Sequence, residues 1–193
     1  IQTEVGITFV HVTHDQEEAM TMADTVAVMN AGGIEQLGSP AELYENPRST
    51  FVANFLGQSN LLRGAVFGSD AHSVGIEVEG ARLQAARAAD ATAGAAEGAV
   101  WVGVRPEKIS LAPAGGDPGG DSNTLRDGVV KDVSFIGVST QYVVRMPWGQ
   151  ELTVFEQNTG ARDRFEVSDK VDLHWMAGHS FLLDASQDAT AGV

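Results

Sequence analysis

Residues 6–20 read Gly-Ile-Thr-Phe-Val-His-Val-Thr-His-Asp-Gln-Glu-Glu-Ala-Met, an apolar run followed by a polar turn and the start of a helical pattern. The run at residues 7–12 is rich in β-branched and aromatic residues, which is typical of a strand buried inside a parallel sheet. Asp15 and Glu18 have the spacing of a capping box, so a helix is predicted over residues 15–23. His14 falls where the strand ends and the helix begins, and open α/β sheets bind ligands at such junctions.

Two interpretations of His14 follow from this position. The N-terminus of a helix disfavours a charged imidazole, and a neutral imidazole offers one donor and one acceptor. Such a group can hold a phosphate oxygen and a water together. The plainer interpretation is a histidine that only closes the turn, and the spacing alone favours it.

A longer ordered set of residues resembles the switch-histidine segment of the ATPases of ABC transporters, in particular the importer subfamily for maltose, polyamines and ferric iron. The resemblance rests on Val12-Thr13-His14-Asp15-Gln16, Glu18-Ala19-Met20, Glu42-Leu43-Tyr44 and residues 51–57. It implies that His14 is the catalytic switch and contacts the γ-phosphate of ATP in the full-length subunit. It also implies ATP and Mg²⁺ as cofactors of that subunit.

Other elements of an ATPase are missing from the sequence. There is no Gly-x-x-x-x-Gly-Lys-Ser/Thr loop, no Leu-Ser-Gly-Gly-Gln signature and no apolar strand that ends in Asp-Glu. In the family these motifs precede the histidine segment. We therefore expect this chain to be the C-terminal part of a longer ATPase, inactive by itself and without a cofactor of its own.

The pattern of the chain changes at Gln58-Ser59-Asn60. Before this point it predicts a β-hairpin at residues 25–29 and 34–37, a short helix opened by Ser39-Pro40, and a helix over residues 47–56. After it the pattern predicts short strands at residues 61–67, 74–79, 100–104, 109–111, 129–136, 140–146, 151–155, 171–175 and 181–183. This spacing indicates a small all-β barrel or sandwich. Residues 85–98 and 113–123 are predicted to be loops.

The second half resembles the OB-type regulatory (TOBE) domain of the same importers. Arg105-Pro106-Glu107 matches a family marker, and residues 174–184 are most similar to the polyamine branch. The predicted fold class is therefore mixed: a truncated α/β end of a P-loop ABC ATPase domain, then an all-β OB-like barrel. The predicted divisions are 1–57 (the end of the nucleotide-binding domain), 58–60 (linker), 61–185 (regulatory β-domain) and 186–193 (tail).

Composition limits the remaining functions. The formal charge of −14 repels phosphate backbones, so nucleic-acid binding is not expected. The sequence has no cysteine, which excludes disulfides and thiolate metal sites. A metal at His11 and His14, or at Asp172, His174 and His179, is not favoured. An ion pair or a backbone clamp is the preferred role of Arg105, and we read Trp101, Trp148 and Trp175 as core or dimer-interface residues.

Together these observations predict the C-terminal regulatory portion of an ABC importer ATPase subunit, with a polyamine as the expected solute. The resemblance implies a homodimer through the regulatory domains, transmembrane permease subunits and an extracellular solute-binding protein as partners. It also implies a cytoplasmic location on the inner face of the cell membrane. The alternative is a stand-alone β-domain that binds a small ligand and is not coupled to an ATPase.

Overall fold

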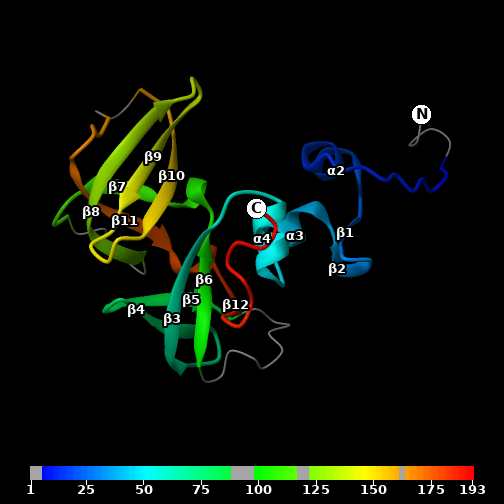
Figure 1. Cartoon of the computed structure of the whole chain (residues 1–193), viewed down its shortest axis with the longest axis horizontal. Helices are drawn as coiled ribbons and strands as arrows, with labels where there is room; N and C mark the ends of the chain where they lie inside the picture. Colours follow the sequence, from blue (N-terminus) through cyan, green and yellow to red (C-terminus); the bar gives the residue numbers. More distant parts are fainter. Residues whose placement is uncertain (1–5, 88–97, 117–121, 161–163) are drawn as a thin grey trace.

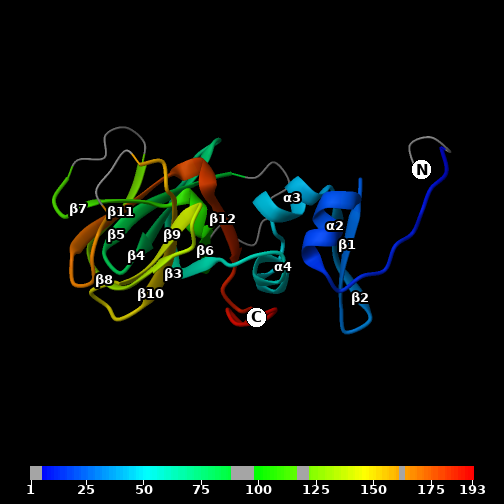
Figure 2. The same ribbon diagram turned by 90° about the horizontal axis from the view of Figure 1, so that it is seen from above.

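A computed structural model describes residues 6–87, 98–116, 122–160 and 164–193. The molecule is elongated, with a small helical segment beside a larger β-region (Figures 1 and 2). The C-terminal end of the chain runs back from the β-region and lies against α4 (Figure 2). Much of the two loops expected at residues 85–98 and 113–123 lies outside the described residues.

The strand expected at residues 7–12 is not formed, and this prediction was wrong. These residues form no β-strand and are exposed, with Val10 at 91% and Val12 at 90% of their full accessible surface. A buried parallel strand requires neighbouring strands on both sides. No described segment pairs with residues 7–12, so their apolar pattern cannot produce a strand here.

The helical segment begins with α2 and contains one antiparallel hairpin. The Asp15 side chain accepts a hydrogen bond from the N–H of Glu18 and so caps α2, as expected. The helix expected over residues 47–56 starts later, because the Ser49 side chain caps it by accepting the N–H of Val52. The elements are α2 Gln16–Met22, β1 Val26–Asn30, β2 Gly33–Gly38, α3 Pro40–Glu45 and α4 Thr50–Phe55.

The β-region consists of two antiparallel five-stranded sheets, which confirms the predicted barrel or sandwich. One sheet has the order β12-β6-β3-β4-β5 and the other β10-β9-β8-β11-β7. Strand β5 was not expected, and β8 is longer than predicted. The strands are β3 Asn60–Ser69, β4 Ser73–Val78, β5 Ala81–Ala86, β6 Ala99–Val104, β7 Ser110–Pro113, β8 Ser122–Phe135, β9 Ser139–Arg145, β10 Glu151–Gln157, β11 Lys170–Met176 and β12 Ser180–Asp184.

The β-region is an internal repeat in which the last strands are exchanged. In the first repeat β3 pairs with β4 and β6, and β4 pairs with β5; in the second β8 pairs with β9 and β11, and β9 pairs with β10. A 3₁₀ turn follows in each case, η1 Pro106–Lys108 and η2 Ala177–His179. Strand β7 then pairs with β11 of the second repeat, and β12 pairs with β6 of the first.

Both sheets contribute to one apolar core, and two buried asparagines join the sheets at its margin. The core includes Leu62 and Val102 from one sheet and Leu125 and Leu173 from the other, all fully buried. Asn60 of β3 exchanges two hydrogen bonds of 2.8 Å with the backbone of Thr153 in β10. Asn123 of β8 makes two bonds of 2.7 Å with the backbone of Gln84 in β5. Strands β10 and β5 lie at sheet edges. Each asparagine side chain thus gives an edge strand the backbone hydrogen bonds that a neighbouring strand would otherwise supply.

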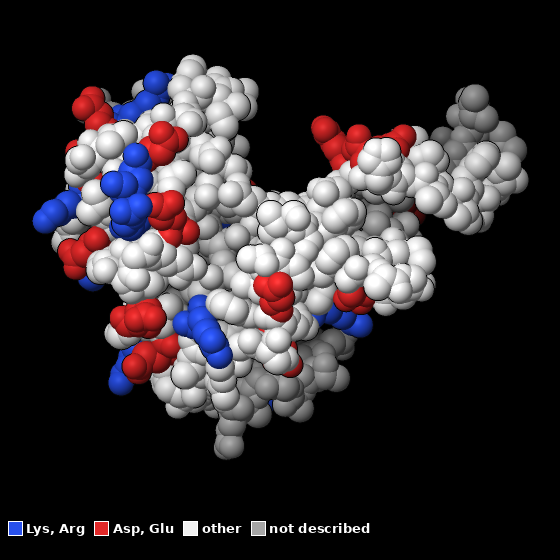
Figure 3. Space-filling model, in the orientation of Figure 1, with Lys and Arg blue, Asp and Glu red and all other residues white. Residues whose placement is uncertain are grey.

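Acidic side chains gather over α2, whereas both signs of charge are interspersed on the visible face of the β-region (Figure 3). The acidic residues of the first turn of α2 are Glu17 and Glu18. Among the described residues, no helix has the length and apolar character needed to cross a membrane.

Candidate functional site

His14 lies in an exposed turn directly before α2. The Thr13 hydroxyl accepts the N–H of Asp15 at 3.0 Å, and the Asp15 carboxylate accepts the N–H of Glu18 at 3.0 Å. Hydrogen bonds from Thr13 and then from His11 lower the pKa of Glu18. The backbone on either side of His14 is therefore fixed by local polar contacts, which leaves the imidazole itself available to a partner.

The described residues do not form an ATP site around His14. His14 is exposed, and no described side chain lies against it in a polar contact. A nucleotide site needs backbone N–H groups and cations around the phosphates. The part of the chain that the structure describes offers one exposed imidazole and no such cradle beside it.

A continuous apolar core links α2 to the two following helices. Met20 of α2 and its C-cap residue Ala23 pack against a buried cluster that contains Leu43 of α3 and Val52 of α4. The side chain of Gln36 in β2 joins the same unit by donating to the carbonyl of Asn46 and accepting the N–H of Arg48. The turn that carries His14 is therefore attached to α3 and α4 through packed side chains.

Arg105 joins this helical segment to the β-region. It follows β6, and only 1% of its surface is accessible. Its Nη1 lies 2.6 Å from the carbonyl oxygen of Ala53, 2.9 Å from that of Gly57 and 2.7 Å from Oγ of Ser59. Its Nη2 donates to the carbonyl of Tyr44 at 2.8 Å. Of the two roles expected for Arg105, an ion pair or a backbone clamp, the structure shows the clamp.

The environment of Arg105 includes an aromatic ring and two further polar contacts. The guanidinium lies 4.1 Å from the centre of the Tyr44 ring, which adds a cation–π attraction. The Tyr44 hydroxyl donates to Glu107 at 2.9 Å, and Lys108 pairs with Glu45 at 3.2 Å. Burial and the Glu107 carboxylate raise the pKa of Tyr44 to about 12, while burial lowers the pKa of Arg105. Both residues keep their protonated forms at neutral pH.

The C-terminal tail makes a second connection between the two parts. Gln187 accepts the N–H of Thr50 at 2.8 Å through its side chain and the indole N–H of Trp101 at 3.0 Å through its carbonyl. The side-chain amide of Asn54 donates to the carbonyls of Ala189 and Ala191. The tail thus bridges α4 and β6, which the sequence did not indicate.

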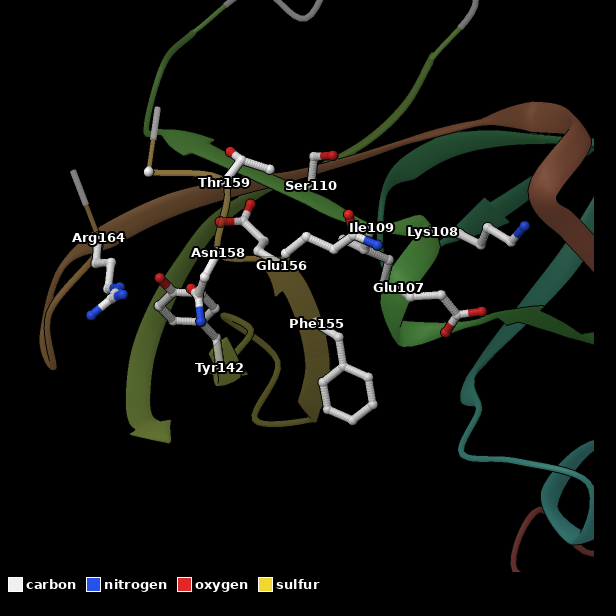
Figure 4. Close-up of a pocket in the computed structure, with 12 residues that line it drawn as sticks. Glu107, Lys108, Ile109, Ser110, Tyr142, Phe155, Glu156, Asn158, Thr159 and Arg164 are labelled. Atoms are coloured by element: carbon white, nitrogen blue, oxygen red, sulfur yellow. The ribbon is translucent and has the colours of Figure 1, made fainter. Parts of the chain in front are cut away.

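A cavity of about 530 Å³ opens beside η1, between that turn, Tyr142 in the middle of β9 and the C-terminal end of β10 (Figure 4). Glu107, Lys108, Glu156 and Arg164 supply both signs of charge to its lining. Glu156 is already bound to the N–H of Leu111 at 2.9 Å, and Arg164 lies over the ring of Phe135 at 4.4 Å. Mixed charge and occupied polar groups select no single class of ligand for this cavity.

Asp172 and His174 have structural contacts within the β-region. The fully buried carboxylate of Asp172 accepts the N–H groups of Gly115 and Asp127, each at 2.9 Å, and pairs with Arg126. Nδ1 of His174 lies 3.0 Å from the Thr124 hydroxyl, and burial lowers the pKa of His174. Over the described part of the chain, no three His, Asp or Glu side chains form a group that could hold a metal ion.

The three tryptophans contribute to packing inside the chain. Trp175 is 3% exposed and lies in the core, and its indole N–H donates to the Ser180 hydroxyl at 2.8 Å. Trp148 packs against the same core, whereas Trp101 packs against the smaller cluster near the tail. The expectation of a core role is confirmed for Trp175.

Comparison with known proteins adds sequence relatives and one solved fold. Residues 102–183 match the TOBE domain family. The spermidine/putrescine import ATP-binding protein PotA of Frankia alni is 44% identical over 191 residues, which cover 95% of this chain and 40% of that protein. The protein of the same name from Thermobifida fusca is 43% identical, with 95% and 46% of the two chains covered. This chain spans less than half the length of these relatives.

One solved structure shares part of the fold. The cytoplasmic molybdate-binding protein ModG, in a form with molybdate bound, superposes with a TM-score of 0.56 at 20% identity. The match covers 64% of this chain and 94% of ModG. At this identity the likeness shows a common fold, which agrees with the predicted OB-like region.

Proposed function

Since this chain carries a TOBE domain and is homologous along nearly its whole length to spermidine/putrescine import ATP-binding proteins, we propose that it is the C-terminal regulatory portion of a polyamine importer's ATP-binding subunit. The observation that carries the proposal is the extent of the match. It covers 95% of the chain, so it includes the helical segment as well as the β-region. A stand-alone ligand-binding β-domain does not account for a match over the helical segment.

Within this proposal the chain divides into the end of a nucleotide-binding domain (1–57), a linker (58–60), the regulatory β-domain (61–185) and a tail (186–193). The P-loop part of the fold and the catalytic motifs belong to the remainder of the full-length subunit. That subunit binds ATP with Mg²⁺ and hydrolyses it. The chain by itself has no such activity, because its sequence lacks the phosphate-binding loop and the signature motif.

We assign His14 in the full-length subunit to the γ-phosphate end of the nucleotide. Support comes from the family motif around His14 and from the turn, which fixes the backbone by side-chain caps and leaves the imidazole exposed. A positioned imidazole can hydrogen-bond to an anionic oxygen and to a water molecule at once. The contribution of this chain to hydrolysis is therefore one hydrogen-bonding group.

The proposal also implies which partners the full-length subunit has. Two copies of the subunit pair, with their regulatory domains in contact, and the pair binds the permease subunits on the inner face of the membrane. An extracellular solute-binding protein delivers the polyamine. Nucleic acid is not a partner, in keeping with the charge of −14.

A chimera tests the function. This chain replaces the matching part of the Thermobifida fusca subunit, and the chimera is assembled with the permease and solute-binding protein of that organism. We expect ATP-dependent uptake of spermidine into proteoliposomes. A chimera that assembles and binds ATP but transports no polyamine contradicts the proposal. A chimera that carries only residues 1–57 of this chain serves as the control for the contribution of the β-region.

A further inference from the structure

The two repeats of the β-region have equivalent turns but different surroundings. Arg105 precedes η1 with φ −73° and ψ 142°, and Met176 precedes η2 with φ −69° and ψ 140°. The backbone is thus nearly the same at both positions. Arg105 is 1% exposed, whereas Met176 is 65% exposed. The helical segment covers the turn of the first repeat and leaves that of the second repeat open.

The chemistry of Arg105 and Met176 explains why the helical segment covers the first turn and not the second. The carbonyl of Tyr44 belongs to the last turn of α3 and that of Ala53 to the last turn of α4, while Gly57 follows the C-cap of α4. Carbonyls at a helix C-terminus have no partner within the helix and carry the negative end of its dipole. One guanidinium with several fixed N–H groups satisfies both helix ends at once. A methionine at the equivalent place offers no donor.

We infer that Arg105 is a positioning residue that docks the helical segment on the first repeat and fixes the orientation of the two parts. Its contacts reach both α3 and α4, whereas the hydrogen bonds that the tail makes to the helical segment, over the described residues, go to Thr50 and Asn54 of α4. The consequence of this inference for the full-length subunit rests on the proposed function. In the full-length subunit, a displacement of the β-region would reach the His14 turn through Arg105, Tyr44 and the packed side chains of α2.

The orientation can be measured on this chain, which has no cysteine of its own. Spin labels are attached to Met22→Cys on α2 and Lys131→Cys on β8, both exposed positions, and their separation is measured by pulsed electron resonance. The test variant is Arg105→Met, which places the residue of the second repeat in the first. The control is Arg145→Met, since the Arg145 side chain is 51% exposed and pairs with Glu151 on the neighbouring strand.

We expect one narrow distance distribution for the chain with its own residues and for the Arg145→Met control. The Arg105→Met variant should lose the narrow peak and give a broad or shifted distribution. Arg105→Lys should give an intermediate width, because a single ammonium group cannot reach the ends of both helices as the guanidinium does.

An unchanged narrow distribution in Arg105→Met overturns the inference and assigns the orientation to the tail. Loss of the β-region's circular dichroism in both Arg105 variants also overturns it, because Arg105 would then be needed for the β-fold itself. The measurement involves no nucleotide and no transport. Failure of the chimera therefore leaves this result standing, and failure here leaves the transport result standing.

Discussion

The asparagine contact between the two sheets gives a prediction that follows directly from hydrogen-bond geometry. Asn123 is 3% exposed, and its amide accepts the N–H of Gln84 and donates to the carbonyl of Gln84, both at 2.7 Å. It also donates to the Ser180 hydroxyl at 3.1 Å. The perturbations are Asn123→Ala, which removes every one of these bonds, and Asn123→Asp, which removes the ability to donate when the new carboxyl is ionised.

The size of the effect follows from the groups left without partners. Gln84 itself is exposed and its two contacts with Asn123 are part-buried. A hydrogen bond of this kind contributes about 0.5–1.5 kcal/mol, so the two together contribute about 1–3 kcal/mol. Removal of the buried amide of Asn123 also relieves part of its own desolvation, and we expect Asn123→Ala to lower the free energy of unfolding by about 1–3 kcal/mol. Asn123→Asp should lose at least as much at neutral pH, because an ionised oxygen then faces the carbonyl of Gln84.

The Asn123→Asp variant also has a predictable pH dependence. Burial and the facing carbonyl raise the pKa of the new carboxyl in the folded state above its unfolded value of about 3.9. A protonated carboxyl can donate to Gln84, so the stability is recovered below the unfolded pKa and is lost as the pH rises through the folded pKa. The deficit relative to the unsubstituted chain should therefore shrink on acidification from neutral pH.

Urea unfolding followed by circular dichroism and tryptophan fluorescence measures these deficits at several pH values. Gln157→Glu, the same change of amide to carboxylate at an exposed position of β10, is the control and should alter stability by less than about 0.5 kcal/mol. A deficit of the aspartate variant that stays constant with pH, or an alanine variant as stable as the control, would refute the backbone-pairing role of Asn123.

Two further predictions concern His14 and Tyr44. In the full-length subunit with its permease, His14→Ala should slow ATP hydrolysis by roughly 10²–10³-fold, while ATP affinity and melting temperature stay near normal. If the rate of hydrolysis stays within a few-fold of the original, His14 is only a turn residue. Tyr44→Phe should cost about 1 kcal/mol at neutral pH, measured by urea unfolding, because its bond to Glu107 is lost. Because the folded pKa of Tyr44 is raised to about 12, this advantage over phenylalanine should be full below about pH 10 and disappear towards about pH 12; a difference that does not change over that range contradicts the assignment.

Local signals in the sequence were sufficient for features that depend on neighbouring residues. Asp15 and Ser39 cap the helices they were expected to cap, and the turn after Asn30 joins the predicted hairpin. A backbone clamp was one of the two roles expected for Arg105, and its burial was not predicted. In each case the deciding contact involves either a short stretch of chain or a residue type with few roles in the interior.

The missed elements depend on distant parts of the chain or on small side chains. Residues 7–12 have the pattern of a buried strand, but a strand exists only where other strands supply hydrogen bonds. Strand β5 buries Leu83 and Ala85. The other alanines of this strand do not favour a strand over other structures, so the sequence pattern does not predict it. Glu79 and Gly80, both at positive φ, form the two-residue turn before it, and this glycine was the available indication. The sequence gives no local sign that β7 and β12 change sheets.

The exchange of β7 and β12 makes the β-region resemble two interlocked copies of one unit that share a single chain. A chain cut between the repeats would leave each sheet holding a strand of the other piece, so the pieces would remain bound as a complex. By the same logic a peptide that contains one repeat has no complete sheet until a second copy donates its last strand. Duplication and fusion of a strand-swapped homodimer would produce such a chain. The Arg105–Met176 difference would then mark where one copy became specialised to carry a helical neighbour.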